Sequence, residues 1–502
     1  MVGLVRPSVL PVAWRAEPPQ DRVLYCAISS HGAEEASVRG AHKTAIALLA
    51  AGVAAFVALR APEHARPRGE RVDGTQRSQA AEQSLDLEAR AAVPSQSALA
   101  PSFDSERVWG TWNDWEPAVA ADPVAPYVYQ LATRYNGTAP CRGCEGPWIV
   151  FRRSVDGGST WGPDRHLTVT EGAFNDPQIE VAADGTIYVV YLEGYEPGVT
   201  LVRSADRGDT WSAPIAIAPR VVAPGWSDKP ILAVSADGAD VYVAFNASDS
   251  YVAASHDRGA SFGNPVRTSF DTRYWFHTGG AVAPDGTVYF AAVDYSQTYE
   301  GESHIDVLCS RDAGESWTTT LLDTSAEAPG CAWSAGCYLG FLGPSAGLAV
   351  DAAGLVVVAY PAGDSPGAPQ RLYVRTSADG VSWGPRLEVG SGHSSVNGAF
   401  PALAAGPNAG DFRLAFQDDR NGIQATWNTW HRRTADGGAS WTEAVRISDR
   451  DSGASYKSAA GYRFPYGDYF ELSVDSAGLT HAIWGEGASY DGPGGVWHTR
   501  GL

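Results

Sequence analysis

Apolar and polar positions alternate along most of the chain in a unit that recurs seven times. Each unit is a short apolar strand, a turn that often carries Asp-Gly or Ala-Gly, and a second strand in which every other residue is apolar. This alternation with a period of two places one face of a strand against a core, and such turns join antiparallel strands into hairpins. The hairpins are 116–129, 176–191, 229–245, 277–292, 345–360, 400–416 and 469–484.

A second repeat, the Asp-box turn, lies between the hairpins. Its six copies are SVDGGSTW (154–161), SADRGDTW (204–211), SHDRGASF (255–262), SRDAGESW (310–317), SADGVSW (377–383) and TADGGASW (434–441). In such a turn the Asp accepts backbone amides and the Gly supplies a positive φ, while the final aromatic residue packs between neighbouring sheets. Each turn would join the third and fourth strands of a unit, and four strands in about 40 to 60 residues is typical of a propeller blade.

The two repeats differ in number, since seven hairpins accompany six Asp-box turns. The seventh unit ends at GGVWHTRGL, which supplies a third strand and no fourth, and ERVWGTW (106–112) is a strand that belongs to no hairpin. We expect this segment to pair with the last blade and close the ring, because closure leaves only short, protected sheet edges. The sequence therefore predicts an all-β propeller of seven blades, or of six if the first or last hairpin is irregular.

The first hundred residues follow a different pattern. Residues 44–59 (TAIALLAAGVAAFVAL) carry no charge, and their length lies between a secretory apolar core and a full membrane span, so both a signal peptide and an anchor remain open. Residues 60–102, rich in Arg, Glu, Gln, Ala, Pro and Ser, predict a disordered linker. Residues 1–43 would be cytoplasmic or lie before the true translation start. We expect residues 103–502 to be the propeller and to lie outside the cytoplasm.

Charge and composition exclude several partners. The formal net charge of -20 and the pI near 4.9 argue against nucleic acid and anionic membrane surfaces, both of which require a basic footprint. We expect a monomer that contacts a membrane only through the N-terminal segment and requires no cofactor.

The cysteines fit an oxidising compartment. Cys141 and Cys144 stand in CRGC, and Cys331 and Cys337 bracket AWSAG, so each pair is spaced for a local disulfide. Cys309 lies in an apolar strand and is predicted to be a buried thiol.

The direction of the strands predicts where a site would lie. Strand one begins on the face where strand two ends, and the Asp-box turns lie on the opposite face. Aligned on their turns, the inner strands begin at Glu116, Asp176, Lys229, His277, Ser345, Phe400 and Tyr469. The ends of the second strands add Glu193, Asp294, Asp418 and Glu486 to that face, with Arg134 and Arg420 close by. Such carboxylates can simply cap turns, but crowded around an axis they also suit a sugar held between an acid and a carboxylate, or Ca²⁺.

The repeats resemble those of the sialidase-like Asp-box (BNR-repeat) propellers, over a region from about Phe103 to Leu502. The resemblance implies an extracellular glycan as ligand and an exo-sialidase or glycosidase type of activity. Members that hydrolyse sialosides hold the substrate carboxylate with three arginines, one of them in an Arg-Ile-Pro motif, and use a Tyr nucleophile helped by a Glu, with an Asp as acid/base. No Arg-Ile-Pro occurs in this chain. A non-catalytic propeller that binds glycan or protein at the cell surface is therefore the alternative.

If the chain acts on a sugar, Tyr469 is the candidate nucleophile. Glu471 follows two positions later and so lies on the same side of the strand. The other catalytic candidates are Asp176, Glu193 and Glu486. The candidate substrate-binding residues are Glu116, Arg134, Lys229, His277, Asp294, Asp418 and Arg420. No metal ligand set is predicted, and Tyr469 would otherwise plug the channel as an aromatic ring.

Overall fold

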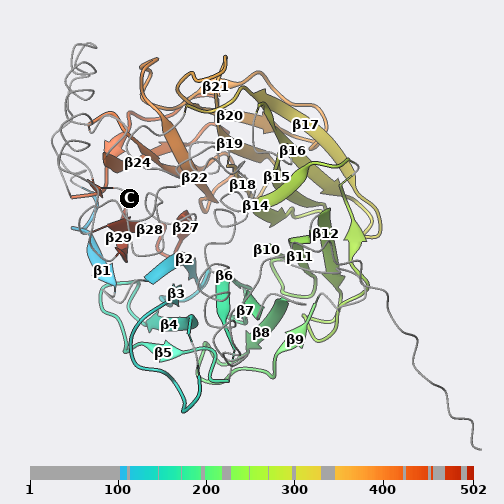
Figure 1. Cartoon of the computed structure of the whole chain (residues 1–502), viewed down its shortest axis with the longest axis vertical. Coiled ribbons are helices and arrows are strands. Elements are labelled where there is room, and N and C mark those ends of the chain that lie inside the picture. The colour runs from blue at the N-terminus through green and yellow to red at the C-terminus, as the bar shows by residue number, and fades with distance from the viewer. Residues whose placement is uncertain are drawn as a thin grey trace, which may run out of the picture. The chain divides into compact units, whose positions relative to one another are not determined.

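The computed structural model describes residues 102–109, 114–144, 146–170, 172–193, 198–217, 228–247, 249–269, 271–296, 301–329, 345–421, 426–449, 454–455, 470–487 and 494–502. All regular elements in these ranges are β-strands, and the ranges hold no helix long and apolar enough to cross a membrane. The strands form seven antiparallel four-stranded blades around one axis (Figure 1); five are separate sheets, and blades 6 and 7 are joined through a short bridging strand. The predicted seven-bladed all-β propeller is confirmed. The predicted segments 1–43 and 44–59, and the linker up to residue 101, lie outside the described residues.

Each blade runs from an inner strand at the axis to an outer strand at the rim. Blade 1 contains β2 (Asp114–Ala121), β3 (Val128–Arg134), β4 (Trp148–Ser154) and β5 (Arg165–His166). Blade 2 contains β6 (Phe174–Val181), β7 (Ile187–Glu193), β8 (Val199–Ser204) and β9 (Ile215–Ala216). Blade 3 contains β10 (Asp228–Val234), β11 (Val241–Ala247), β12 (Asp249–Ser255) and β13 (Val266–Arg267). Blade 4 contains β14 (Tyr274–Val282), β15 (Val288–Tyr295), β16 (Ser303–Ser310) and β17 (Thr318–Ser325).

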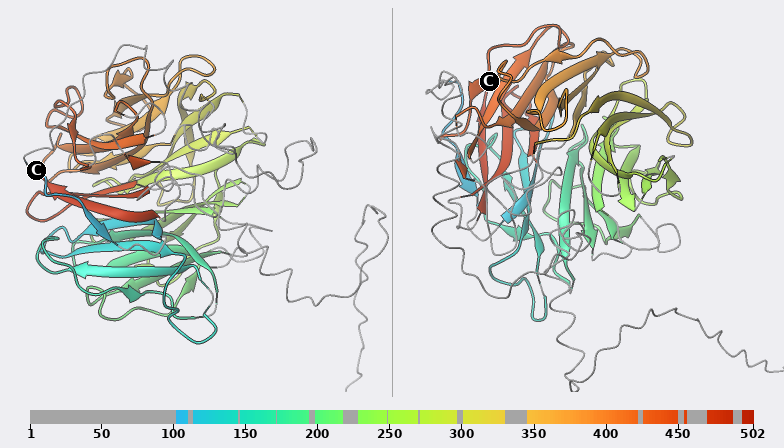
Figure 2. Two further views of the ribbon diagram at one scale, coloured as in Figure 1. Left: turned by 60° about the vertical axis from the view of Figure 1, so that its left-hand side comes forward. Right: turned by 45° about the horizontal axis from the view of Figure 1, so that its top comes forward.

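The remaining blades follow the same order. Blade 5 contains β18 (Gly347–Val350), β19 (Val356–Ala362), β20 (Arg371–Ser377) and β21 (Leu387–Glu388). Blade 6 contains β22 (Gly398–Ala405), β23 (Phe412–Asp418), β24 (Thr426–Thr434) and β25 (Val445–Arg446). Blade 7 contains β27 (Phe470–Val474), β28 (Thr480–Gly487), β29 (Gly494–Gly501) and β1 (Arg107–Trp109). The short strand β26 (Ala454–Ser455) bridges β24 and β28. The oblique views show the blades standing side by side around the axis (Figure 2).

Asp-box turns join the third and fourth strands, as the repeat predicts. In the first copy Asp156 Oδ1 accepts the backbone N–H of Thr160 at 2.8 Å, and Asp156 Oδ2 accepts its hydroxyl at 2.6 Å. These hydrogen bonds hold the pKa of Asp156 down at about 2. The residue after the Asp is left-handed even where it is not glycine, with φ of 57° at Arg207 and 62° at Arg258. We name the surface that carries these turns the box face and the opposite end of the axis the mouth.

Hydrophobic clusters fill the seven interfaces between neighbouring blades in the described part of the chain. The aromatic residue of each Asp-box turn enters the interface with the preceding blade. Trp211 of blade 2, for example, packs edge-to-face on Phe151 of blade 1, with ring centroids 5.4 Å apart. Such aromatic pairs contribute about 0.5–1.5 kcal/mol beyond the area they bury.

The ring closes where the two ends of the described propeller meet. β1 pairs antiparallel with β29 as the fourth strand of blade 7, so the predicted closure is confirmed (Figure 1). It covers Arg107–Trp109 of the predicted 106–112 segment, of which residues 110–112 lie outside the described residues. Trp109 and Trp161 sandwich the Arg152 guanidinium, whose Cζ lies 4.5 and 4.7 Å from the two ring centroids. The closing strand of blade 7 is thereby fastened to blade 1.

The turn that blade 7 lacks is replaced by residues from both ends of the propeller. Phe103 forms a β-bridge with Gly501 and packs on His431 of blade 6, with ring centroids 4.9 Å apart. His431 stands three residues before the first residue of its Asp-box turn, as Phe151 does in blade 1, so Phe103 takes the place of the missing box aromatic. Asp104 completes the junction by accepting from Arg500 Nε at 2.9 Å.

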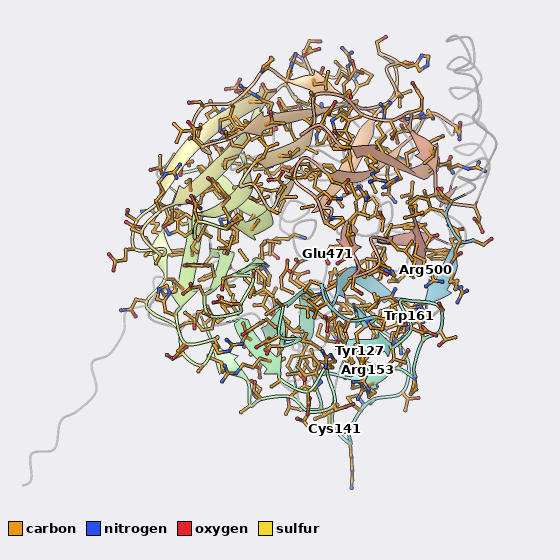
Figure 3. All side chains as sticks on the ribbon, turned by 180° about the vertical axis from the view of Figure 1, so that it is seen from behind. Tyr127, Cys141, Arg153, Trp161, Glu471 and Arg500 are labelled. Carbon is orange, nitrogen blue, oxygen red and sulfur yellow. A yellow bond between two sulfur atoms is a disulfide. The ribbon has the colours of Figure 1, made fainter. Side chains whose placement is uncertain are left out.

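An arginine at the end of the third strand repeats a second contact between blades. Arg153 donates to the backbone oxygen of Arg207 in the next Asp-box turn at 2.5 Å, and Arg203 donates likewise to Arg258. In blade 7 Arg500 occupies this position and donates to the oxygen of Gly157. The closing interface therefore uses the same bond as the interfaces inside the ring (Figure 3).

Two of the cysteine predictions are confirmed. Cys141 and Cys144 form a disulfide with Cα atoms 5.2 Å apart, and Cys309 is a buried free thiol in β16. Cys331 and Cys337 lie outside the described residues.

We expect a chain that starts at residue 114 to be destabilised by at least about 3 kcal/mol, because it loses the buried Phe103 and Trp109 and exposes the edge of β29. Calorimetry and light scattering would measure the loss and the resulting aggregation. A chain that starts at residue 102 keeps β1 and should melt like the full chain. Equal melting of the two truncations would contradict the closure.

Candidate functional site

A cavity of about 230 Å³ lies on the axis and is lined by the inner strands of all seven blades. It is smaller than the roughly 300–1,000 Å³ of sites for drug-sized ligands. Three of the predicted site residues, Lys229, His277 and Glu471, line it, together with Ser345 and Phe400 from the predicted mouth. Glu471 lies at the centre of the ring when the propeller is seen from behind (Figure 3).

The mouth is shaped by a β-bulge near the start of several inner strands. Glu116, Asp176, Lys229 and Phe400 each precede a proline at the bulge and have φ between 49° and 53°. A non-glycine residue in this region costs about 1–3 kcal/mol and persists only where its surroundings enforce it. The same local device thus recurs in four blades at the positions predicted to face the mouth.

Two of these residues, Glu116 and Asp176, are buried between blades 1 and 2 and do not line the cavity. Glu116 Oε2 accepts the backbone N–H of Asp176 at 3.1 Å. The hydroxyl of Tyr135 donates to Asn175 Oδ1 at 3.2 Å beside them. Their visible role is to join the inner strands of two blades.

The candidate arginines of the mouth face are held by aspartates. Arg134 makes two hydrogen bonds of 2.8 Å to Asp114 and also lies 2.9 Å from Asp164. Arg420 donates to Asp418 from Nε to Oδ1 at 3.0 Å and from Nη2 to Oδ2 at 2.6 Å. Each of these two guanidiniums, predicted to bind substrate, already holds a carboxylate in a bidentate manner.

The candidate Asp294 has a similar position in blade 4. It is 2% exposed, accepts from Arg273 Nε, and lies 3.1 Å from His304 Nδ1. At the end of β7, Glu193 Oε2 accepts the hydroxyl of Thr200 at 3.3 Å. Neither carboxylate lines the cavity. Tyr469 and the side chain of Glu486 lie outside the described residues.

His277 lines the cavity from blade 4 as a neutral imidazole. It is 1% exposed, and burial lowers its pKa to about 3. Its Nε2 lies 2.8 Å from Ser250 Oγ, whereas no described group lies within hydrogen-bond distance of its Nδ1. One nitrogen of a buried ring in the cavity wall therefore has unused hydrogen-bonding capacity.

In two layers of described inner-strand residues below the mouth, the polar side chains come from blades 2 and 7. In each inner hairpin, the backbone amide just after the first strand donates across the turn to the residue just before the second strand, so its residue marks the same height in every blade. These residues are Asp122, Ala182, Ser235, Ala283, Asp351, Gly406 and Asp475, and the layers of each inner strand are counted backward from them. Four residues back, the layer is Ala118, Gln178, Ile231, Gly279, Gly347, Ala402 and Glu471. Two residues back, it is Ala120, Glu180, Ala233, Ala281, Ala349, Ala404 and Ser473. Most residues of these two layers of the channel are thus small. The four polar ones are Gln178, Glu180, Glu471 and Ser473.

Small residues are required in this bore because the inner strands approach closely. A Cβ on Gly279 would lie 2.8 Å from the backbone nitrogen of Leu348, and a Cβ on Gly347 would lie 2.9 Å from the oxygen of Pro401. Side chains of any size would push blades 4, 5 and 6 apart.

Glu471 and Ser473 bond to the edge of blade 1. An inner strand is a sheet edge, so its outward amides need acceptors. Glu471 Oε2 accepts the N–H of Val119 at 2.8 Å, and Ser473 Oγ accepts the N–H of Ala121 at 2.9 Å. The spacing of two residues matches on both strands, so β27 is fastened to β2 in register.

Burial changes the acidity of both channel carboxyl groups. Burial and then the negative charge of Glu180 raise the pKa of Glu471 to about 8, against the opposing hydrogen bonds from Val119 and Gln178. Glu180 is exposed to solvent where it lines the cavity, so desolvation raises its pKa less strongly than that of Glu471. Two carboxyl groups of unusually weak acidity therefore face one cavity.

Glu180 and Gln178 were not predicted as site residues. The signal that could have found them is the hairpin alignment continued past the rim, where every other blade carries an apolar residue or glycine. For Ca²⁺, the described ranges hold no group of three His, Cys, Asp or Glu side chains placed to bind a metal ion, so Ca²⁺ binding stays a prediction.

The chain was compared with family models, curated proteins and solved structures. No family model and no curated protein matches the chain. Among solved structures, a Hadza microbial sialidase is 14% identical with a TM-score of 0.41, covering 72% of this chain and 74% of its own. An ulvan lyase is 13% identical with a TM-score of 0.47, covering 78% and 95%. Trypanosoma rangeli sialidase in complex with sialic acid is 12% identical with a TM-score of 0.40, covering 80% and 59%.

The acidity of Glu471 predicts how stability depends on pH. The folded protein keeps this proton up to about pH 8, whereas the unfolded chain releases it near 4.5. Between these values the folded state binds more protons, so its stability falls as pH rises, by at most about 1.4 kcal/mol per pH unit. Glu471→Gln keeps an oxygen for the Val119 amide and should remove the contribution of Glu471 to this slope in denaturant titrations, leaving the smaller contribution of Glu180.

The matched control is Glu315→Gln, at an exposed position in the fourth Asp-box turn. It should leave the slope unchanged. An identical pH dependence in Glu471→Gln and the parent chain would refute the raised pKa.

Proposed function

We propose that this protein is an extracytoplasmic propeller that binds the terminal, uncharged sugar of a glycan end-on in the channel mouth. The observation that carries the proposal is the axial cavity, which has room for one small ligand. Its wall combines aromatic rings, Phe276, Tyr295 and Phe400 among them, with the polar Lys229 and His277. Apolar walls with a few placed polar groups are typical of small-molecule sites, and aromatic faces suit sugar rings.

The charge around the cavity favours a neutral sugar over a sialic acid. Arg134 and Arg420, the two arginines predicted to bind substrate, are each held by an aspartate. The channel itself carries Glu180 and Glu471, and the whole chain has a formal net charge of -20. An anionic sugar would be repelled by the net negative charge of the chain, whereas hydroxyl groups can hydrogen-bond to Glu180 and Glu471 in either protonation state.

The path of the chain supports a mouth that faces outward. The N-terminal segment enters the propeller at the box face, where Phe103 meets Gly501 and Leu502 donates to Ser102. If residues 44–59 anchor the chain and residues 60–101 are flexible, a tether of roughly 35 Å would leave from the box face. The mouth would then be the face turned away from the membrane and open to glycans.

Ligand binding should depend on free space at the mouth. Ser345→Trp places a large ring in the cavity wall and should weaken binding of neutral glycans at least about tenfold, or about 1.4 kcal/mol. Val381→Trp adds the same ring at an exposed position on the box face and should leave affinity unchanged. A glycan array followed by calorimetry would measure both. Preferential binding of sialylated glycans, or equal affinity of the two variants, would sink the proposed site.

Location can be tested on cells that produce the full chain. We expect the propeller to be accessible to added protease, with Cys141 and Cys144 unreactive to thiol reagents because they are joined. A full-length cytosolic protein with both cysteines reduced would exclude the extracytoplasmic assignment. Cys309 is the internal control, since it should react only after unfolding.

A further inference from the structure

The channel holds a pair of carboxyl groups whose electrostatic surroundings differ from those of the rim. Glu180 comes from blade 2 and Glu471 from blade 7, and they flank blade 1, where the matching positions are Ala118 and Ala120. Among the described residues the charged group that acts on Glu471 is the like-charged Glu180, not a cation. Like charges in one cavity repel, and this repulsion adds to desolvation in favouring the protonated form of Glu471.

The hydrogen bonds place that proton on a particular oxygen. Glu471 Oε2 accepts the N–H of Val119, and the side chain of Gln178 also hydrogen-bonds to this carboxyl group. A carbonyl oxygen is a better acceptor than a hydroxyl oxygen, so the Val119 hydrogen bond to Oε2 favours Oε1 as the oxygen that carries the proton of a neutral Glu471. The carboxyl group then presents an O–H donor beside the acceptor oxygens of Glu180.

His277 provides an independent sign that the cavity is built for a ligand. Its ring is 1% exposed, lines the same cavity, and has no described hydrogen-bond partner at Nδ1. Buried polar atoms are normally satisfied, and an exception calls for a missing partner such as a ligand or water. The other titratable groups that line this cavity are Lys229 and Tyr295.

We propose that Glu471 and Glu180 are the acid and base of a glycoside hydrolase acting on the neutral sugar in the channel. This rests on the function proposed above. Glu471 Oε1–H gives its proton to the glycosidic oxygen while the bond from the anomeric carbon to that oxygen breaks. A water molecule attacks the anomeric carbon and gives a proton to the Glu180 carboxylate, as in a two-carboxylate hydrolysis. One water is consumed, a free sugar and an alcohol are formed, and the proton returns from Glu180 to Glu471 through the solvent.

The experiment uses the purified full chain with fluorogenic neutral glycosides and with the neutral glycans found by the array. Glu471→Gln and Glu180→Gln should each lower kcat by about 10²–10⁴-fold while affinity for the glycan changes little. Glu315→Gln, far from the axis in an Asp-box turn, should retain full activity. Melting temperatures of the variants separate loss of folding from loss of chemistry.

The pH profile of kcat/KM gives a readout that a merely structural role would not move. The base must be ionised and the acid protonated, so the parent chain should show a bell-shaped profile. Glu180→Gln should remove its acid limb, and Glu471→Gln should remove its alkaline limb, in whatever activity remains. Infrared titration of the carboxyl band tests the protonation of Glu471 without substrate, because Glu471→Gln should delete a band that persists at neutral pH.

The outcomes separate this inference from the function on which it rests. Glycan binding without turnover, together with no protonated carboxyl band at neutral pH, would overturn the acid–base pair and leave the binding function intact. Turnover that survives Glu471→Gln would overturn it as well. Absence of both binding and turnover would instead remove the proposed function itself.

Discussion

Pairing of β1 with β29 is the contact on which the rest of the structure depends. Without it, blade 7 would have three strands and an open edge, and Phe103 could not enter the interface between blades 6 and 7. The partners are almost 400 residues apart along the chain, as in the bond between Arg500 and Asp104. The entropy lost on closing a loop grows only slowly with its length, so this distant pairing can form once the other blades have assembled.

Closure also decides the chemistry of the bore. Because the blades are radial, their inner strands are sheet edges with amides that face the axis. At the junction of blades 7 and 1, Glu471 and Ser473 satisfy two of those amides. The side chain that fastens the ring is therefore also the one that carries a carboxyl group into the cavity. The contact that fastens the ring and the proposed acid–base chemistry therefore depend on the same carboxyl group.

At the mouth, ion pairs with neighbouring residues determine which of the predicted side chains are free to bind a ligand. Asp114 and Arg134 are directly opposite each other in the β2–β3 pair, so the sheet itself brings them into an ion pair. Asp418 and Arg420 are two residues apart and form the same kind of pair, with Trp430 under the guanidinium. Their positions on the mouth face could be predicted from strand direction. That each arginine is already paired with an aspartate could be recognised only from hairpin register and side-chain geometry.

The sequence by itself determined the blade, the Asp-box turns, the face that holds the mouth and the strand that closes the ring, and it favoured seven blades over six. These features repeat, and each depends on residues close together in the chain: turn chemistry, alternation and the spacing between the two repeats. Only the tertiary structure decided that Phe103 replaces a missing box aromatic and that Glu180 and Glu471, on either side of blade 1, line one cavity. Contacts between different blades depend on how far each inner strand lies from the axis and which way its side chains turn. These distances result from packing seven sheets around one bore, and no local pattern in the chain encodes them.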